Sequence, residues 1–243
     1  MPVQGEAFDV ELPPRRALRP LTAFRGSLAQ RVYAALREAI LDLSLRPGDI
    51  LRKPEICETL GVSRSPVSEA VARLAVEHLV QVVPQAGTYV ARFSWAEIRE
   101  GAFLREALEL AAVEQVARTV TEEELVQLRR NLRLQAGLIE DRDVAGFYQS
   151  DAEMHELILS FTGFRRLAVL ADASWVHVNR ARQLILPQPG RVGDTLAEHR
   201  AIVAAIEARD PVAARAATKA HLGKLIGILE PIAQNRPDLF DPE

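Results

Sequence analysis

Apolar side chains recur every three to four positions along the first part of the chain, which is the period of a helix with one buried face. They form one stripe, at Leu28, Val32, Leu36, Ile40 and Leu43. The stretch "RPGD" at 46–49 then ends the pattern, because proline has no N–H to continue a helix and glycine permits a sharp turn. The sequence therefore predicts a first helix that starts near residue 27.

Two shorter helices and a hairpin are predicted next. The second helix covers 54–59 and ends at Gly61, a residue type that readily adopts the left-handed conformation after a helix. The third covers about 65–78, with Pro66 in its first turn, where a missing N–H costs no hydrogen bond. The β-rich segments "VQVVP" and "TYVARF", separated by "QAG", are typical of a small hairpin. Three helices and a two-stranded wing outline a winged helix-turn-helix domain over 27–93.

The residues before this domain show no sustained period. Residues 1–26 are rich in Pro, Arg and Gly, which is typical of a flexible arm. Arg15, Arg16 and Arg19 belong either to a solvated arm or to a segment that reaches DNA.

After Ser94 the pattern is helical only. Three stretches fit the capping box, in which a hydroxyl and a Glu three residues later satisfy free N–H groups: "SWAE" at 94–97, "TEEE" at 121–124 and "TLAE" at 195–198. Asp210 before Pro211 is a further helix start. Amphipathic helices are expected near 95–119, 122–140, 144–161, 165–186, 195–208 and 211–233. We therefore expect a mainly α protein, with an all-helical bundle of six to seven helices over 94–234 and a tail over 235–243.

Composition narrows the class of protein. Hydrophobic residues make up 48% and charged residues 26% of 243, as in soluble globular proteins. No window has the about 18 apolar residues of a membrane span, and the first residues lack the apolar centre of a signal peptide. The one cysteine, Cys57, cannot form an internal disulfide and is expected to be a small buried side chain. A cytoplasmic protein that does not interact with membranes is expected.

Charge is distributed unevenly. The net charge is −3, but residues 1–92 carry 12 basic and 10 acidic side chains, whereas 93–243 carry 18 and 23. The first segment is the better candidate for a phosphate partner, although this bias alone is small.

The segment "LRPGDIL…LGVSRSPVSEAVARLAVEHLVQVVPQAGTYV" closely resembles the winged-helix domain of GntR-family transcription regulators. The helical remainder is similar to the FadR-type C-terminal domain of that family. The resemblance covers 28 to about 230 and is most specific at "GVSRSPVSEAV". It implies a homodimer that binds a palindromic DNA operator, acts as a repressor and releases the operator when it binds a ligand.

The chemistry of that motif suits DNA. A helix N-terminus presents free N–H groups and partial positive charge, so Ser63 and Ser65 suit a phosphate. Arg64 can bond both acceptors of a guanine in the major groove. The alternative is that a serine caps the helix and Arg64 is solvated.

Two positions depart from the family pattern. Ser68 stands where the family usually has a second Arg, so a DNA contact there is shortened or lost. His78 stands where the family usually has Gly, at a position that favours a left-handed backbone. Further DNA candidates are Arg52 and Lys53, and Gly87 at the wing tip; each is also compatible with ordinary loop chemistry.

Four residues of the helical region form a candidate metal set. Asp151 and His155 lie at i and i+4, on one face of a helix. His199 and His221 each lie in a different predicted helix. A lone His is more often a structural residue than a ligand, but this set is similar, position by position, to the metal set of the FadR-type domain. Three imidazoles and one carboxylate suit a divalent transition metal, with Zn or Ni as first candidates.

A carboxylate ligand is the expected effector. Arg105 matches the family's R-x-x-L-E motif in "FLREALEL" and offers a planar fork to an acid, or else pairs with Glu109. Asn179 and Arg180 are further candidates for effector binding.

The residues and the resemblance together predict a ligand-responsive transcription regulator and not an enzyme. The effector would be a small organic acid. Two alternatives are a metal-dependent enzyme with an accessory DNA-binding domain and a regulator whose metal is purely structural. The sequence lacks the H-E-x-x-H motif that would favour the enzyme.

Overall fold

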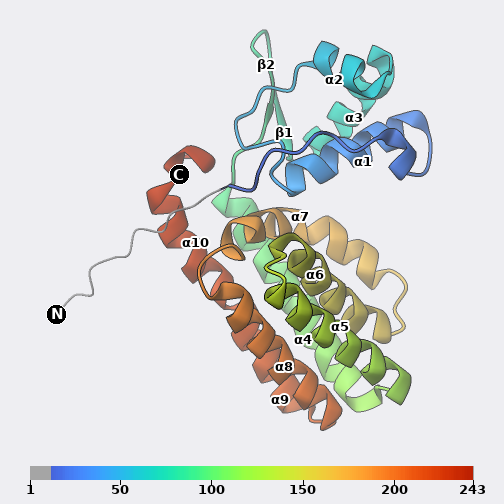
Figure 1. The fold of residues 1–243 in the computed structure, drawn as a ribbon, viewed down its shortest axis with the longest axis vertical. Helices are drawn as coiled ribbons and strands as arrows, with labels where there is room; N and C mark the ends of the chain where they lie inside the picture. Colours follow the sequence, from blue (N-terminus) through green and yellow to red (C-terminus); the bar gives the residue numbers. More distant parts are fainter. Residues whose placement is uncertain (1–11, 243) are drawn as a thin grey trace, which may run out of the picture. The chain divides into compact units, whose positions relative to one another are not determined.

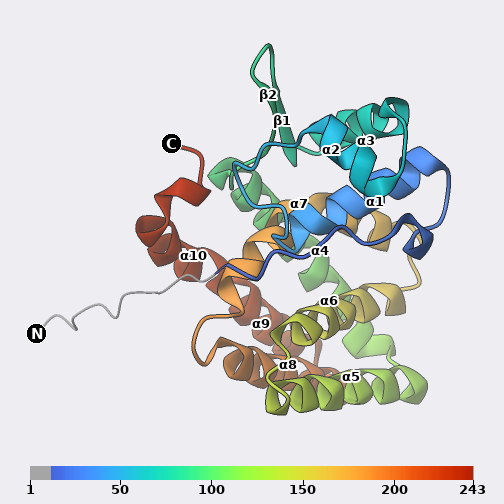
Figure 2. The same cartoon turned by 45° about the horizontal axis from the view of Figure 1, so that its top comes forward.

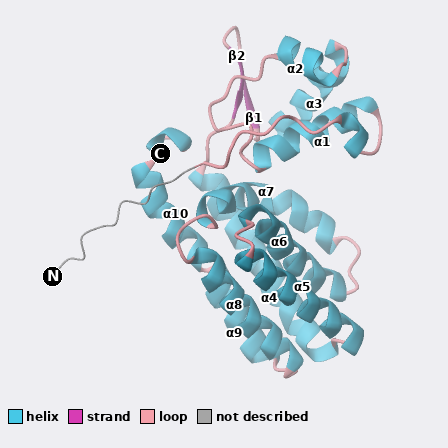
Figure 3. Ribbon diagram, viewed as in Figure 1, coloured by secondary structure: helices cyan, strands magenta, loops and turns pink. Residues whose placement is uncertain are grey.

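The computed structural model describes residues 12–242, which form two compact units. One unit contains residues 12–95 and 236–242, and the other contains 96–235. Strands occur only in the first unit among these residues, as Figure 3 shows, so the expected mainly α fold is confirmed. No helix in the described part of the chain is both long and apolar enough to span a bilayer.

The first unit is a winged helix-turn-helix. Its helices are α1 (Leu28–Leu41), α2 (Lys53–Leu60) and α3 (Arg64–Val76), and its antiparallel wing consists of β1 (Val80–Val83) and β2 (Gly87–Val90) (Figure 1). The apolar stripe of α1 is buried against α3, with Val32, Leu36 and Ile40 fully enclosed. The order and type of these elements are as predicted.

Two residues have the positive φ angles that the sequence predicts for them. Gly61 ends α2 with φ of 64°, and His78 follows α3 with φ of 55°, in the left-handed region expected for it. A side chain with a Cβ is strained there, so glycine would suit position 78 better. Cys57 differs from the expectation: it is half-buried rather than buried, because Ile56 occupies the inward position of α2.

Residues 12–26, the described part of the predicted arm, make specific contacts that the sequence does not suggest. Residues 1–11 of the predicted arm lie outside the described residues. In the remainder, Arg15 forms an ion pair with Asp49 at 2.6 Å and Arg19 one with Glu38 at 3.0 Å, although exposed pairs stabilise weakly. A 3-10 turn follows at Leu21–Ala23.

The segment interpreted as a tail belongs to the winged unit. Phe240 forms a parallel bridge with Phe93, and its ring lies 5.3 Å from that of Phe93 and 5.5 Å from that of Trp95. The backbone N–H of Phe93 donates to Leu239. The sequence shows too few apolar residues there to indicate this packing.

The second unit is a bundle of helices. Its members are α4 (Trp95–Thr119), α5 (Glu122–Glu140), α6 (Val144–Phe161), α7 (Leu167–Ile185), α8 (Arg191–Glu207), α9 (Pro211–Leu222) and α10 (Lys224–Asn235). Figure 1 and Figure 2 show α5 beside α6 and α8, and α8 beside α9. The capping box of Thr121 with Glu124 is present, and Asp210 accepts from two N–H groups of α9. At Gly101, α4 approaches the backbone of α7 closely.

Two helix boundaries of the bundle differ from the prediction. Helix α8 begins at Arg191 after Gly190, and the Thr195 hydroxyl donates to the Arg191 carbonyl inside the helix instead of capping it. The helix expected over 211–233 is divided by a turn at Gly223, a residue type that favours helix weakly.

Candidate functional site

The N-terminus of α3 presents polar side chains to solvent. Ser63 is the N-cap residue and makes no capping hydrogen bond through its side chain, so capping does not occupy its hydroxyl. Ser63, Arg64, Ser65 and Ser68 are all exposed. The buried face of α3 holds Val67, Val71 and Leu74 instead. The helix is therefore anchored by one face and offers the other to a partner.

The other DNA candidates lie at the start of α2 and at the wing. Arg52 is exposed and pairs with Glu55 at 3.3 Å, and Lys53 is half-buried. Gly87 is exposed at the start of β2 with φ of 139°, a conformation that favours glycine. No contact within the protein distinguishes these residues as nucleic-acid ligands.

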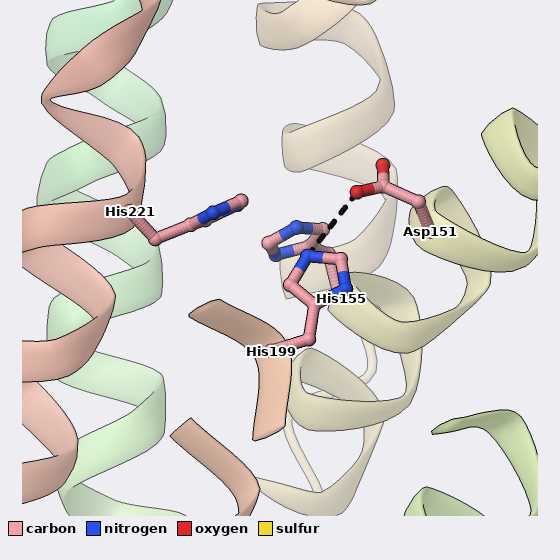
Figure 4. Close-up of side chains that lie close together, drawn as sticks. All are labelled: Asp151, His155, His199 and His221. Carbon is pink, nitrogen blue, oxygen red and sulfur yellow. Dashed lines mark ion pairs between the residues drawn. The ribbon is translucent and has the colours of Figure 1, made fainter. Parts of the chain in front are cut away.

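The four predicted metal ligands meet inside the bundle. Asp151 and His155 come from α6, His199 from α8 and His221 from α9, and one ligand atom of each lies within 4.8 Å of the others. All four side chains are buried, and Figure 4 shows them pointing toward one another. The cluster lies within one unit and joins three helices that are distant in sequence.

A second layer of side chains orients the imidazoles. The Nδ1 atom of His155 is 2.6 Å from Glu109, that of His199 is 2.8 Å from Gln135, and that of His221 is 2.6 Å from Glu198. Metal-binding histidines typically donate their second ring N–H to such acceptors. This arrangement leaves the Nε2 atoms of His155 and His199 without a hydrogen-bond partner.

Burial sets the charge of these groups. It lowers the pKa of His155, and lowers the pKa values of His199 and His221 well below the usual range. Burial alone raises the pKa of Glu109, but His155 and Arg105 outweigh it and leave that pKa well below its ordinary value. The imidazoles are therefore neutral; those of His155 and His221 face carboxylates, and that of His199 faces the amide oxygen of Gln135. Neutral imidazole is the form that binds a metal.

The residues present fit a divalent metal. The Nε2 atoms of His155 and His199 and both carboxylate oxygens of Asp151 are buried without a hydrogen-bond partner. His199 Nε2 lies 3.2 Å from Asp151 Oδ1, the contact dashed in Figure 4, and the guanidinium of Arg182 contacts Asp151 Oδ2. Buried polar atoms are rarely left unsatisfied, so this donor set is consistent with a metal site.

A cavity adjoins the cluster. Its lining includes Asp151, His221 and three arginines, Arg105, Arg182 and Arg191, together with apolar side chains of α7, α9 and α10 such as Ile185, Leu222, Leu225 and Ile228. Positive charge and apolar surface are thus combined beside the candidate metal centre.

The predicted effector residues differ in their placement. Arg105 lines the cavity but pairs with Glu109 at 2.6 Å, and its guanidinium lies 5.2 Å from the ring centre of Trp175. Arg180 is fully buried and, with Asn179, is not among the lining residues. Because Arg180 and Arg182 are two positions apart on α7, they point to nearly opposite faces, and it is Arg182 that reaches the cavity.

Sequence reasoning missed the supporting residues. The sequence pattern indicates Glu109 only as a partner of Arg105, and Glu198 only as part of a capping box. Arg191 and Gln135 carry no local signal.

Comparison with known proteins places the chain in a family. Residues 28–90 match the family model "Bacterial regulatory proteins, gntR family", and residues 100–224 match the model "FCD domain". The repressor RspR of Escherichia coli K12 is 31% identical over 88% of this chain and 94% of its own length. A regulator from an unstable DNA locus of Streptomyces ambofaciens is 34% identical over 86% of this chain and 88% of its own length.

A solved structure gives the same result. A GntR transcriptional regulator from Rhodococcus sp. RHA1 is 27% identical and superposes with a TM-score of 0.74, over 84% of this chain and 99% of that chain. A winged helix-turn-helix and a helical bundle with a buried His and Asp cluster define a class of DNA-binding regulators. The chain belongs to the gntR family of bacterial regulatory proteins and carries the FCD domain of its FadR subfamily. It is a transcription regulator and not an enzyme.

Proposed function

We propose that the chain is a ligand-responsive repressor that binds a palindromic operator as a homodimer and releases it when a small organic acid binds beside a divalent metal. The observation that carries this proposal is the buried cluster of Asp151 and three histidines with a cationic cavity at its side. A regulator of this kind works in the cytoplasm, where its DNA is.

In this proposal the N-terminus of α3 reads DNA. Arg64 bonds a guanine in the major groove, while Ser63 and Ser65 bind a phosphate together with the free N–H groups of the helix. Arg52, Lys53, Ser68 and the backbone at Gly87 add contacts that position the domain. All of these residues except Lys53, which is half-buried, are exposed, and this exposure supports the assignment.

Asp151, His155, His199 and His221 would hold the metal, with zinc or nickel as first candidates. A divalent ion at such a site supplies a Lewis acid to which a carboxylate can bind. Arg105 and the other cavity arginines would orient the acid by bidentate hydrogen bonds. The apolar lining would select against fully polar acids.

A homodimer is supported by apolar side chains on or next to α4 and α7. Phe103, Phe164, Val169 and Leu170 are more than half exposed. Patches of this kind typically mark an interface, and two-fold symmetry would present two copies of α3 to a palindrome. Light scattering should give twice the mass of the chain.

The test combines metal analysis with DNA release. We expect purified protein to contain about one metal per chain, and the variants His199→Ala and His221→Ala to have lost it. An operator selected from a random DNA pool should bind the metal-loaded protein and be released by one member of a panel of organic acids. A large loss of stability on chelation, with no acid that releases DNA, would leave the metal a structural role only, and turnover of an acid would favour an enzyme.

A further inference from the structure

The ion pair between Arg182 and Asp151 involves a candidate metal ligand. Arg182 on α7 contacts the carboxylate of Asp151 on α6, and the two side chains are 8% and 0% exposed. The Arg182 guanidinium also lies 5.3 Å from the ring centre of Tyr148 and donates to Asn179 Oδ1 at 3.4 Å. A carboxylate that is fully buried requires a counter-charge, and Arg182 supplies it here.

The contact occupies one oxygen of the Asp151 carboxylate, while the other oxygen faces the histidine cluster. Asp151 Oδ1 faces His199 at 3.2 Å, and Oδ2 faces Arg182, so the guanidinium stands beside the ligand set. A divalent ion in the cluster would therefore share the one carboxylate with Arg182, and the two cations would repel each other across it.

Binding of a divalent ion would change the balance of charge in the cavity. The three cavity arginines each have a carboxylate partner: Arg105 with Glu109, Arg182 with Asp151 and Arg191 with Glu198. These six groups balance. A divalent ion adds two positive charges without adding a carboxylate, and it takes the partner of Arg182 in particular.

We infer that Arg182 is an exchangeable counter-ion, which holds Asp151 when no metal is bound, releases it to a divalent ion, and then binds an anionic group of the effector. This inference rests on the proposed metal and acid site, and it narrows the effector to acids with two negative charges. One charge would meet the metal and the other Arg182. Metal and dianion must then strengthen each other's binding by the same factor.

The first experiment measures Zn²⁺ binding to the full chain by calorimetry without any organic anion, for wild type and Arg182→Gln. Removing the competitor of the metal should tighten Zn²⁺ binding by about tenfold or more. The matched control is Arg191→Gln, which removes the same charge from the same cavity but leaves the pair of Arg182 with Asp151 in place. It should change Zn²⁺ affinity by clearly less.

The second experiment adds succinate as a dianion and acetate as a monoanion at constant ionic strength. Succinate should tighten Zn²⁺ binding to wild type more than acetate does, and Arg182→Gln should lose most of this difference. If the variant folds only with zinc, its release of zinc to a chelator provides the readout, and release should be slower than from wild type.

The outcomes separate the two proposals. Equal or weaker Zn²⁺ binding by Arg182→Gln, or equal effects of Arg182→Gln and Arg191→Gln, would overturn the role of Arg182 and leave the metal site standing. Wild type that binds no zinc, nickel or other divalent metal would overturn both.

Discussion

Replacing Glu109 by Gln should have the largest effect of any single isosteric change in the bundle. The Glu109 carboxylate accepts from Arg105 Nε at 2.6 Å and from His155 Nδ1 at 2.6 Å, and it is 2% exposed. An amide has one oxygen, so its NH₂ group must face one of these two N–H donors. The substitution also leaves the Arg105 guanidinium buried without its counter-charge.

Removing one partner of a buried ion pair costs about 3–5 kcal/mol. We expect a loss of that size in the free energy of unfolding of Glu109→Gln, measured by urea denaturation in the presence of a chelator. Metal affinity should fall by about 10- to 100-fold as well, because His155 loses the acceptor that orients it.

The matched control is Glu114→Gln on the same helix. Glu114 pairs with Arg118 at 3.4 Å and with Arg215 at 3.0 Å, near solvent, and its loss should cost less than about 1 kcal/mol. If Glu109→Gln is no more destabilising than this control, then Glu109 does not hold Arg105 and His155 as argued here.

Three further predictions concern other parts of the molecule. Gly101→Ala places a Cβ 2.9 Å from the Ser174 carbonyl oxygen, and we expect it to lower the free energy of unfolding by about 1–3 kcal/mol in thermal unfolding. A Tm equal to that of wild type would show that α4 and α7 are not closely packed there. Arg64→Ala should weaken binding to a selected operator by about 1–3 kcal/mol and relax its specificity in mobility-shift assays, and unchanged specificity would remove Arg64 from base recognition. Chelated protein should lose stability as pH falls from about 7 to 5. The three cluster histidines have lowered pKa values in the folded chain, so the unfolded chain, with histidine pKa values near 6.5, binds protons first. Denaturant midpoints that do not change over this pH range would mean that these imidazoles are not held neutral.

Much of the fold could be predicted because its signals are local. The stripe of α1, the glycine after α2 and the capping box at Thr121 each depend on residues within one or two turns of one another. Thr195 shows where this reasoning fails. Its sequence context fits a cap, but a threonine hydroxyl can equally donate to a carbonyl within a helix, and only the position of Gly190 decides between the two.

The candidate metal centre was predicted in part for the same reason. Asp151 and His155 are neighbours on one helix, and the resemblance to a known family supplied His199 and His221. The second layer was not predicted, because Glu109 and Gln135 reach their histidines from helices 46 and 64 positions away in the chain. Such contacts depend on how the helices pack, which spacing does not encode.

The packing of Phe240 on Phe93 returns the end of the described chain to the winged unit. Within residues 12–242 the chain passes between the two units twice, once near residue 95 and once near residue 236. Two covalent connections therefore join the units within these residues. The second attachment continues directly from α10, whose Leu225 and Ile228 line the cavity. The chain therefore runs directly from a helix that lines the cavity into the segment that packs on Phe93 in the winged unit.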